Sequence, residues 1–287
     1  ETVRAEAIQK FGVLPDVQAN SKRPLTDAKT TLGRQLFYEK RLSKNQDLAC
    51  NTCHDLNAYG VDRRSGSVKT SLGHRGQLGT RNAPTVYNAA RHVAQFWDGR
   101  AVDVEEQAKG PILNPVEMAL PNAAAVVSML KSIPGYMPLF QAAFPGVKDP
   151  ITYDNVGIAI GAFERKLVTQ DRFDDYLSGD KDVLSPDEVR GLYVFLNSGC
   201  PACHTGPGVG GELYRKMGDV KVYPSNGDTG RFEVTKKEMD RNVFKVPSLR
   251  NIDRTGPYFH DGSQSTLTAA IRTMSEYQTI GGKLSDD

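Results

Sequence analysis

The four cysteines of the chain fall into two clusters, and a histidine directly follows each cluster. Residues 50–54 read C-N-T-C-H, and residues 200–204 read C-P-A-C-H. The C-x-x-C-H spacing is the attachment pattern of haem c. Two thiols on one helical turn can reach the two vinyl groups of a porphyrin, and the next residue then offers an imidazole to the iron. The sequence therefore predicts two covalently bound haem c groups.

The two predicted haems have separate attachment residues, and other uses of the cysteines fit less well. Disulfide bonds would leave both following histidines unexplained. Paired zinc knuckles usually lie roughly 15–20 residues apart, whereas these clusters lie in opposite halves of the chain. The predicted attachment and proximal residues are Cys50, Cys53 and His54 for the first haem, and Cys200, Cys203 and His204 for the second.

The charge and composition of the chain exclude several classes of protein. Its 287 residues include 36 Lys+Arg and 34 Asp+Glu, a formal net charge of +2. Because neither a basic excess nor a basic run is present, we expect no nucleic-acid partner. The hydrophobic content of 39% suits a soluble protein. The longest stretch without a strong breaker, residues 156–163, is far shorter than the ~20 residues of a membrane span.

The two haem motifs predict a mainly α-helical fold with two cytochrome c-like haem domains, long irregular loops and few short strands. An amphipathic helix is predicted before each motif, and the second begins with a capping box at residues 185–188. Another helix is expected over residues 152–168, and the polar residues 170–182 are interpreted as a linker. We therefore expect an N-terminal haem domain at residues 1–168 and a C-terminal haem domain at residues 169–287.

Five further motifs resemble those of the bacterial di-haem cytochrome c peroxidases, to which the di-haem enzyme that matures tryptophan tryptophylquinone is related. The motifs occur in the order of the family, and the resemblance covers nearly the whole chain. They are residues 73–77 (GHRGQ), 81–85 (RNAPT), 96–100 (FWDGR), 114–118 (NPVEM) and 256–262 (GPYFHDG).

The resemblance implies different tasks for the two haems. The N-terminal haem on His54 would be the peroxidatic one, with His74 as its removable distal ligand. The C-terminal haem on His204 would carry Met274 and transfer electrons, because thioether ligation raises the reduction potential. Tyr277 lies one helical turn after Met274 and is a rival ligand, since the quinone-maturing relative uses a tyrosine there.

The resemblance also implies roles around the two irons. Trp97 would lie between the haems and carry electrons, while Glu117 and Gln107 would line the peroxide pocket. In that pocket, Glu117 would move a proton between the peroxide oxygens. From the residues alone, His92 is expected on the surface, and the role of His260 is open.

One calcium ion is implied between the two domains. Its ligands would be the side chain of Asn82 and the backbone carbonyls of Thr255 and Pro257, completed by water. Ligation by oxygen alone suits a hard cation. Family members are often calcium-dependent dimers, so a homodimer is compatible with the resemblance, although no sequence patch is diagnostic of one.

The implied function is reduction of hydrogen peroxide to water with electrons from a soluble cytochrome c or a cupredoxin. We expect a periplasmic protein, because haem c is attached on the far side of the bacterial inner membrane. The start at Glu1 rather than Met suits a mature secreted form. Two alternatives stay open: a di-haem electron carrier without a substrate, and an enzyme of the quinone-maturation type that oxidises a protein.

Overall fold

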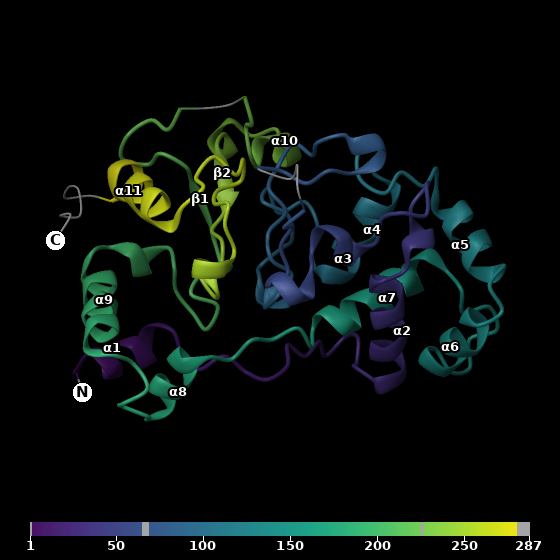
Figure 1. Ribbon diagram of the computed structural model, residues 1–287, viewed down its shortest axis with the longest axis horizontal. Coiled ribbons are helices and arrows are strands. Elements are labelled where there is room, and N and C mark those ends of the chain that lie inside the picture. Colours follow the sequence, from purple (N-terminus) through teal and green to yellow (C-terminus); the bar gives the residue numbers. More distant parts are fainter. Residues whose placement is uncertain (1, 65–68, 225–226, 280–287) are drawn as a thin grey trace.

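The computed structural model describes residues 2–64, 69–224 and 227–279, and it is mainly helical, as predicted. Figure 1 shows an elongated molecule with two lobes. The helices are α1 (Thr2–Lys10), α2 (Asp27–Phe37), α3 (Cys50–Cys53), α4 (Val104–Leu113), α5 (Ala123–Lys131), α6 (Tyr136–Ala143), α7 (Tyr153–Glu164), α8 (Arg172–Ser178), α9 (Pro186–Asn197), α10 (Phe232–Thr235) and α11 (Leu267–Gln278). The strands β1 (Tyr214–Lys216) and β2 (Val243–Lys245) form one antiparallel pair.

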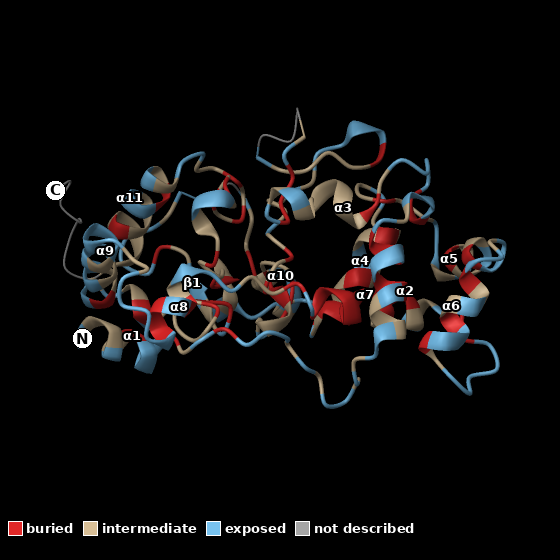
Figure 2. Ribbon diagram, turned by 60° about the horizontal axis from the view of Figure 1, so that its bottom comes forward, coloured by how far each residue is buried: buried red, intermediate tan, exposed pale blue. Residues whose placement is uncertain are grey.

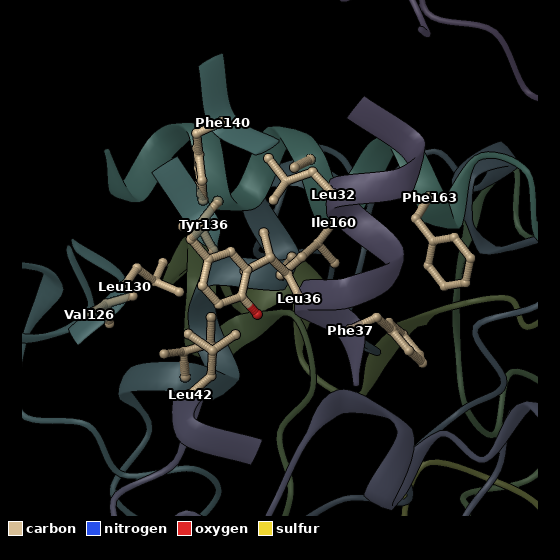
Figure 3. Packing of buried hydrophobic residues seen from close by; sticks show 14 of the residues in the cluster. Leu32, Leu36, Phe37, Leu42, Val126, Leu130, Tyr136, Phe140, Ile160 and Phe163 are labelled. Carbon is tan, nitrogen blue, oxygen red and sulfur yellow. The ribbon is translucent and has the colours of Figure 1, made fainter. Parts of the chain in front are cut away.

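The first lobe is built around α7, which packs against α2 and α4. Figure 2 shows buried residues concentrated along α7, and Figure 3 shows the apolar side chains that meet there. Leu32 and Leu36 of α2 and Ile160 of α7 are fully buried in this core, together with Phe140 of α6. Burying one such side chain contributes about 1.5–3 kcal/mol. This core fixes α2 just ahead of the first haem motif.

The helices begin where the sequence offers capping side chains. The hydroxyl of Thr152 accepts a hydrogen bond from the backbone N–H of Asn155 at the start of α7. At α9, the predicted capping box is confirmed, because Ser185 and Glu188 bond each other's backbone N–H groups. Such caps satisfy N–H groups that have no partner within the helix.

The second lobe has a smaller core that includes the N-terminal helix. Ala7 of α1 and Phe11 are buried against Tyr176 and Leu177 of α8 and Leu196 of α9. The first residues of the chain, which the expected boundary assigned to the N-terminal domain, therefore pack in the second lobe. The chain crosses to the first lobe before α2 and returns after α7 (Figure 1).

The interpretation of residues 170–182 as a linker is wrong, because α8 lies within them. Asp171 caps this helix, and its side chain accepts from the backbone N–H of Phe173. One polar residue of this helix, Asp174, forms a buried ion pair. Its carboxylate accepts hydrogen bonds from two guanidinium nitrogens of Arg250, at 2.5 and 2.9 Å. Asp174 also accepts from the backbone N–H of Leu14 and so ties three segments together.

Within the described ranges, no helix alone is long and apolar enough to cross a membrane. The consecutive helices α5 and α6 pass the same length and composition test only as a pair, with a bend of 110° between them.

The close approach of α2 to α7 predicts a strong effect of one added methyl group. A Cβ at Gly33 would lie 1.8 Å from the carbonyl oxygen of Ala159, so Gly33→Ala should force the helices apart. We expect a loss of about 1–3 kcal/mol in the free energy of unfolding, measured by urea titration of far-UV circular dichroism.

Gly191→Ala is the matched control, because Gly191 is an exposed mid-helix residue with no atom within 4 Å of the added Cβ. It should stabilise the protein by up to about 1 kcal/mol, as expected for alanine in a helix. Equal effects of the two substitutions would contradict the packing of α2 on α7.

Candidate functional site

The first haem motif forms a short helix that presents both thiols and one imidazole. Cys50 and Cys53 are the first and last residues of α3, and neither forms a disulfide bond. The next residue, His54, has its Nδ1 3.3 Å from the carbonyl oxygen of Gly60. Burial lowers the pKa of His54. A neutral imidazole whose Nδ1–H is held by a carbonyl leaves Nε2 as a metal ligand, so these residues fit a haem.

The second motif makes a tighter turn after α9. Cys200 begins a 3-10 turn and, like Cys203, is a free thiol. Burial lowers the pKa of His204 to about 4, so its imidazole is neutral and able to bind a metal. Among the described residues, its buried Nδ1 has no hydrogen-bond partner. A Cβ at Gly210 would lie 3.1 Å from this nitrogen, so glycine is needed there.

The structure brings the predicted distal residues His74 and Glu117 together through the backbone. The N–H of His74 donates to the carbonyl oxygens of Val116 and Glu117, at 3.0 and 2.8 Å. The approach depends on glycine, because a Cβ at Gly73 would lie 1.9 Å from the Val116 oxygen. His74 is buried with an exposed fraction of 7%.

Glu117 lies in a segment that folds back over α4. Backbone N–H groups of Met118 and Leu120 donate to carbonyl oxygens of the last turn of α4, the helix that carries Gln107. Burial raises the pKa of Glu117, while Arg100 and the side chain of Asn114 oppose the increase. A carboxyl group with a raised pKa can both accept and release a proton at moderate pH.

Trp97 lies at the junction of the two lobes and forms hydrogen bonds through both its indole and its backbone. Its Nε1–H donates to the carbonyl oxygen of Asn82 at 2.9 Å, and its own carbonyl oxygen accepts from the N–H of Lys245 at 2.8 Å. Its ring lies edge-on to the ring of His260, with centroids 6.4 Å apart. His260 is itself buried and stacked on Phe244. Trp97 therefore contacts both halves of the chain.

Two of the three predicted calcium ligands meet at the same junction. The side-chain amide of Asn82 lies 2.6 Å from the carbonyl oxygen of Pro257, and Thr255 precedes it in the same segment. The orientation of an amide is assigned rather than observed, and a rotation would present its oxygen instead. No cluster of three or more His, Cys, Asp or Glu residues suited to a metal ion occurs in the part of the chain that the structure describes.

Met274 and Tyr277 both lie on α11, in the lobe that also contains the second haem motif. Both residues are partly buried. The ring of Tyr277 packs edge-on against Tyr223, with centroids 5.2 Å apart.

Comparison with known proteins connects these features to one family. The sequence model described as di-haem cytochrome c peroxidase matches residues 27–182, more than half of the chain. The chain belongs to this family. Membership of a di-haem family implies two haem c groups, in agreement with the two C-x-x-C-H motifs.

Relatives and a solved structure extend the match beyond residue 182. The chain is 49% identical to the cytochrome c551 peroxidase of Nitrosomonas europaea, covering 86% of this chain and 72% of that protein. It is 45% identical to the cytochrome c551 peroxidase of Pseudomonas aeruginosa, covering 92% and 76%. A crystal structure of a MauG-like protein associated with microbial copper homeostasis has a TM-score of 0.81 at 32% identity, covering 96% of this chain and 82% of that chain.

In this member of the di-haem peroxidase family, one buried pair of side chains, His92 and Lys245, was not predicted from the sequence. The expectation that His92 lies on the surface is wrong: its Nε2 is buried and its Nδ1 lies 2.9 Å from Nζ of Lys245. Lys245 has an exposed fraction of only 6%. A lysine inside the apolar run Val-Phe-Lys-Val was the available signal.

A second missed signal is an internal repeat. Residues 82–100 align without gaps with residues 245–263, and several aligned positions hold the same residue. In this alignment, Asn82 corresponds to Lys245, and Trp97 corresponds to His260. The structure shows the same symmetry, because the N–H of Asn82 donates to the carbonyl oxygen of His260 just as the N–H of Lys245 donates to that of Trp97. The identical pairs include Pro84/Pro247, Asn88/Asn251, Phe96/Phe259, Asp98/Asp261 and Gly99/Gly262.

The contact between the His74 loop and the Glu117 segment predicts the effect of Gly73→Ala. The added Cβ should separate the two segments, so backbone amides of residues 72–78 should exchange with deuterium at least tenfold faster, as measured by mass spectrometry. Gly79→Ala is the control in the same loop, because its nearest atoms lie 3.7 Å from the added Cβ. Unchanged exchange in Gly73→Ala would contradict this contact.

Proposed function

We propose that this chain reduces hydrogen peroxide to water with electrons from a small soluble redox protein, a cytochrome c or a cupredoxin. Family membership and two relatives named cytochrome c551 peroxidase support the proposal. The observation that carries it is the pairing of the His74 loop with the Glu117 segment. Backbone bonds join the glycine-rich loop that carries His74 to the segment that carries Glu117, and this pairing supports a shared pocket for the two side chains.

The chain's own residues would hold the haems through the thiols of each motif and the imidazoles of His54 and His204. When bound, the haem on His54 supplies the iron at which the peroxide O–O bond is broken. His74 would be a removable ligand of this iron. Its loop is held to the Glu117 segment by backbone bonds, and each bond is worth only about 0.5–1.5 kcal/mol, so the loop can leave without unfolding the lobe.

Glu117 moves the proton that the reaction requires. The carboxylate would take a proton from one oxygen of hydrogen peroxide and give it to the other, so that water rather than hydroxide departs. Gln107 orients the peroxide in the same pocket. Because burial raises the pKa of Glu117, its active carboxylate form is lost as the pH falls through a value above the ordinary one.

Electrons enter at the second lobe and cross the junction. Met274 would ligate the iron of the haem held by His204, and a thioether ligand would favour the reduced state of that haem. Trp97 carries the electron between the lobes, since its indole and its backbone are bonded to residues of both halves. We assign one calcium ion to Asn82, Thr255 and Pro257, and a periplasmic location to the protein.

A second candidate function is oxidation of a protein substrate, as in the quinone-maturation enzymes. The observation that favours it is the likeness to a MauG-like structure at 32% identity. This function requires Tyr277 rather than Met274 on the second iron. A near-infrared ligand band of a His/Met haem supports the peroxidase, and its absence supports the second candidate.

Glu117→Gln should retain the absorption spectra of both haems and lose peroxide turnover by about 10²–10⁴-fold, the usual contribution of a general acid–base group. The acidic limb of the kcat/KM profile should disappear with the carboxyl group. Stopped-flow and steady-state assays with a reduced donor measure both effects.

Glu106→Gln is the control, because Glu106 lies on α4 with its side chain 41% exposed and paired to Lys109. It should leave turnover unchanged. Turnover by Glu117→Gln within threefold of the unsubstituted protein would remove the acid–base role of Glu117.

His74→Gly should open one coordination position in the resting oxidised protein. We expect a high-spin ferric signal in the electron paramagnetic resonance spectrum at rest, together with peroxide reactivity before any reduction. Gln77→Gly changes an exposed residue of the same loop and should leave the low-spin spectrum intact. Identical resting spectra for His74→Gly and the unsubstituted protein would show that His74 is not a ligand.

A further inference from the structure

Lys245 is a buried amine that forms no ion pair with a carboxylate of the described residues. It ends β2, and its Nζ lies 2.9 Å from Nδ1 of His92. Among the described residues it forms no ion pair within 4.0 Å. Asp98 attracts it from further away, but Arg81 and Arg100 already bind that carboxylate. Burial lowers the pKa of Lys245 to about 7, which shows how poorly the chain alone compensates this charge.

Two neighbouring donors are also unsatisfied. Within the described part of the chain, the buried Nε2 of His92 and the buried Nε of Arg91 have no hydrogen-bond partner. The nearest acidic contact of Arg91 is a long one, 3.8 Å to Glu212. A buried polar group without a partner costs about 1–3 kcal/mol. Burial lowers the pKa of His92, and the positive charges of Lys245 and Arg91 lower it further, so these three side chains act on one another.

The group lies directly beside the second haem site. A Cβ at Gly211 would fall 2.2 Å from the ring of His92, and a Cβ at the adjacent Gly210 would fall 3.1 Å from the ring of His204. The two imidazoles therefore flank one pair of glycines. Backbone bonds fix this arrangement, since the N–H of Gly211 donates to the carbonyl oxygen of Val246 at 2.8 Å.

The backbone does not require a lysine at this position. Asn82, the equivalent residue of the internal repeat, makes the matching cross-lobe bond through its own N–H. Any residue other than proline can donate such a bond. The backbone bond therefore does not explain why the buried residue at this position is a lysine.

We propose that Lys245 and His92 bind a propionate carboxylate of the haem attached to Cys200 and Cys203, and thereby raise the reduction potential of that haem. The inference rests on the two-haem assignment within the proposed function. Haem c brings carboxylates of its own to the site, and a charge-assisted hydrogen bond would satisfy both the amine and the imidazole. Positive charge beside the porphyrin favours the reduced state, which carries one positive charge fewer.

Lys245→Met removes the charge while keeping an unbranched side chain. We expect the midpoint potential of the second haem to fall by about 59 mV, a tenfold change in a one-electron equilibrium. Spectroelectrochemical titration of both haems measures this shift. Resonance Raman spectra should show a displaced propionate bending mode in the same variant. Lys245→Arg keeps the charge and should restore most of the potential.

Lys216→Met is the matched control, because Lys216 is an exposed lysine on the partner strand β1. Solvent screening should leave both potentials unchanged in this variant. Unchanged potentials and an unchanged Raman mode in Lys245→Met would overturn the inference. If that variant does not retain both covalent haems, His92→Gln replaces it, and an unshifted potential there overturns the inference equally.

Peroxide turnover separates this inference from the proposed function. A lowered potential in a protein that never reduces peroxide would defeat the proposed function and support the binding of the propionate. Normal peroxide turnover together with unshifted potentials in Lys245→Met would support the proposed function and overturn the binding of the propionate.

Discussion

Trp97 is held from two sides, and the alignment of the two lobes depends on this constraint. Its indole bonds the first half at Asn82, and its carbonyl group bonds the second half at Lys245. The reverse bond, from Asn82 to His260, completes a reciprocal pair. Further polar contacts cross the same junction, including the ion pair of Arg81 with Asp228 and the bond from Arg63 to the carbonyl oxygen of Gly256. An electron-linked change in one lobe can therefore reach the other.

A second set of contacts holds the loop that carries His74. Its side chain is buried, yet its loop depends on glycine and on backbone bonds to the Glu117 segment. Met118, next to Glu117, is itself part of the large apolar core around α2 and α7, so this core anchors the Glu117 segment. The first haem motif lies on the short helix α3, whereas His74 lies on a loop. Burial also raises the pKa of the Glu117 carboxyl group.

Local patterns in the sequence predicted local structure well. The C-x-x-C-H motifs, the capping box of α9 and the apolar face of α7 each depend on residues close together in the chain, and the structure has these helices where expected. The packing of α1 in the second lobe was not predictable in this way, because Phe11 meets Leu196 only through the fold. The helix α8 was missed because its polar Asp174 is buried against Arg250, far along the chain.

The residues of the candidate site were likewise predicted from the sequence only in part. Family motifs named His74, Glu117 and Trp97, and the structure brings them to one loop contact and one junction. Lys245 and His92 escaped because no motif marks either residue, and their proximity arises from the pairing of β2 with the loop after the second haem motif. The roles of Met274 and of the calcium ligands depend on groups that bind from outside the chain, so they stay predictions.

The most direct test of the account is the electron paramagnetic resonance spectrum of the protein reduced by one electron. The account predicts that the second haem loses its low-spin ferric signal while the first gains a high-spin signal that hydrogen peroxide abolishes. Two irons that stay low-spin and unreactive towards peroxide at every level of reduction would contradict it.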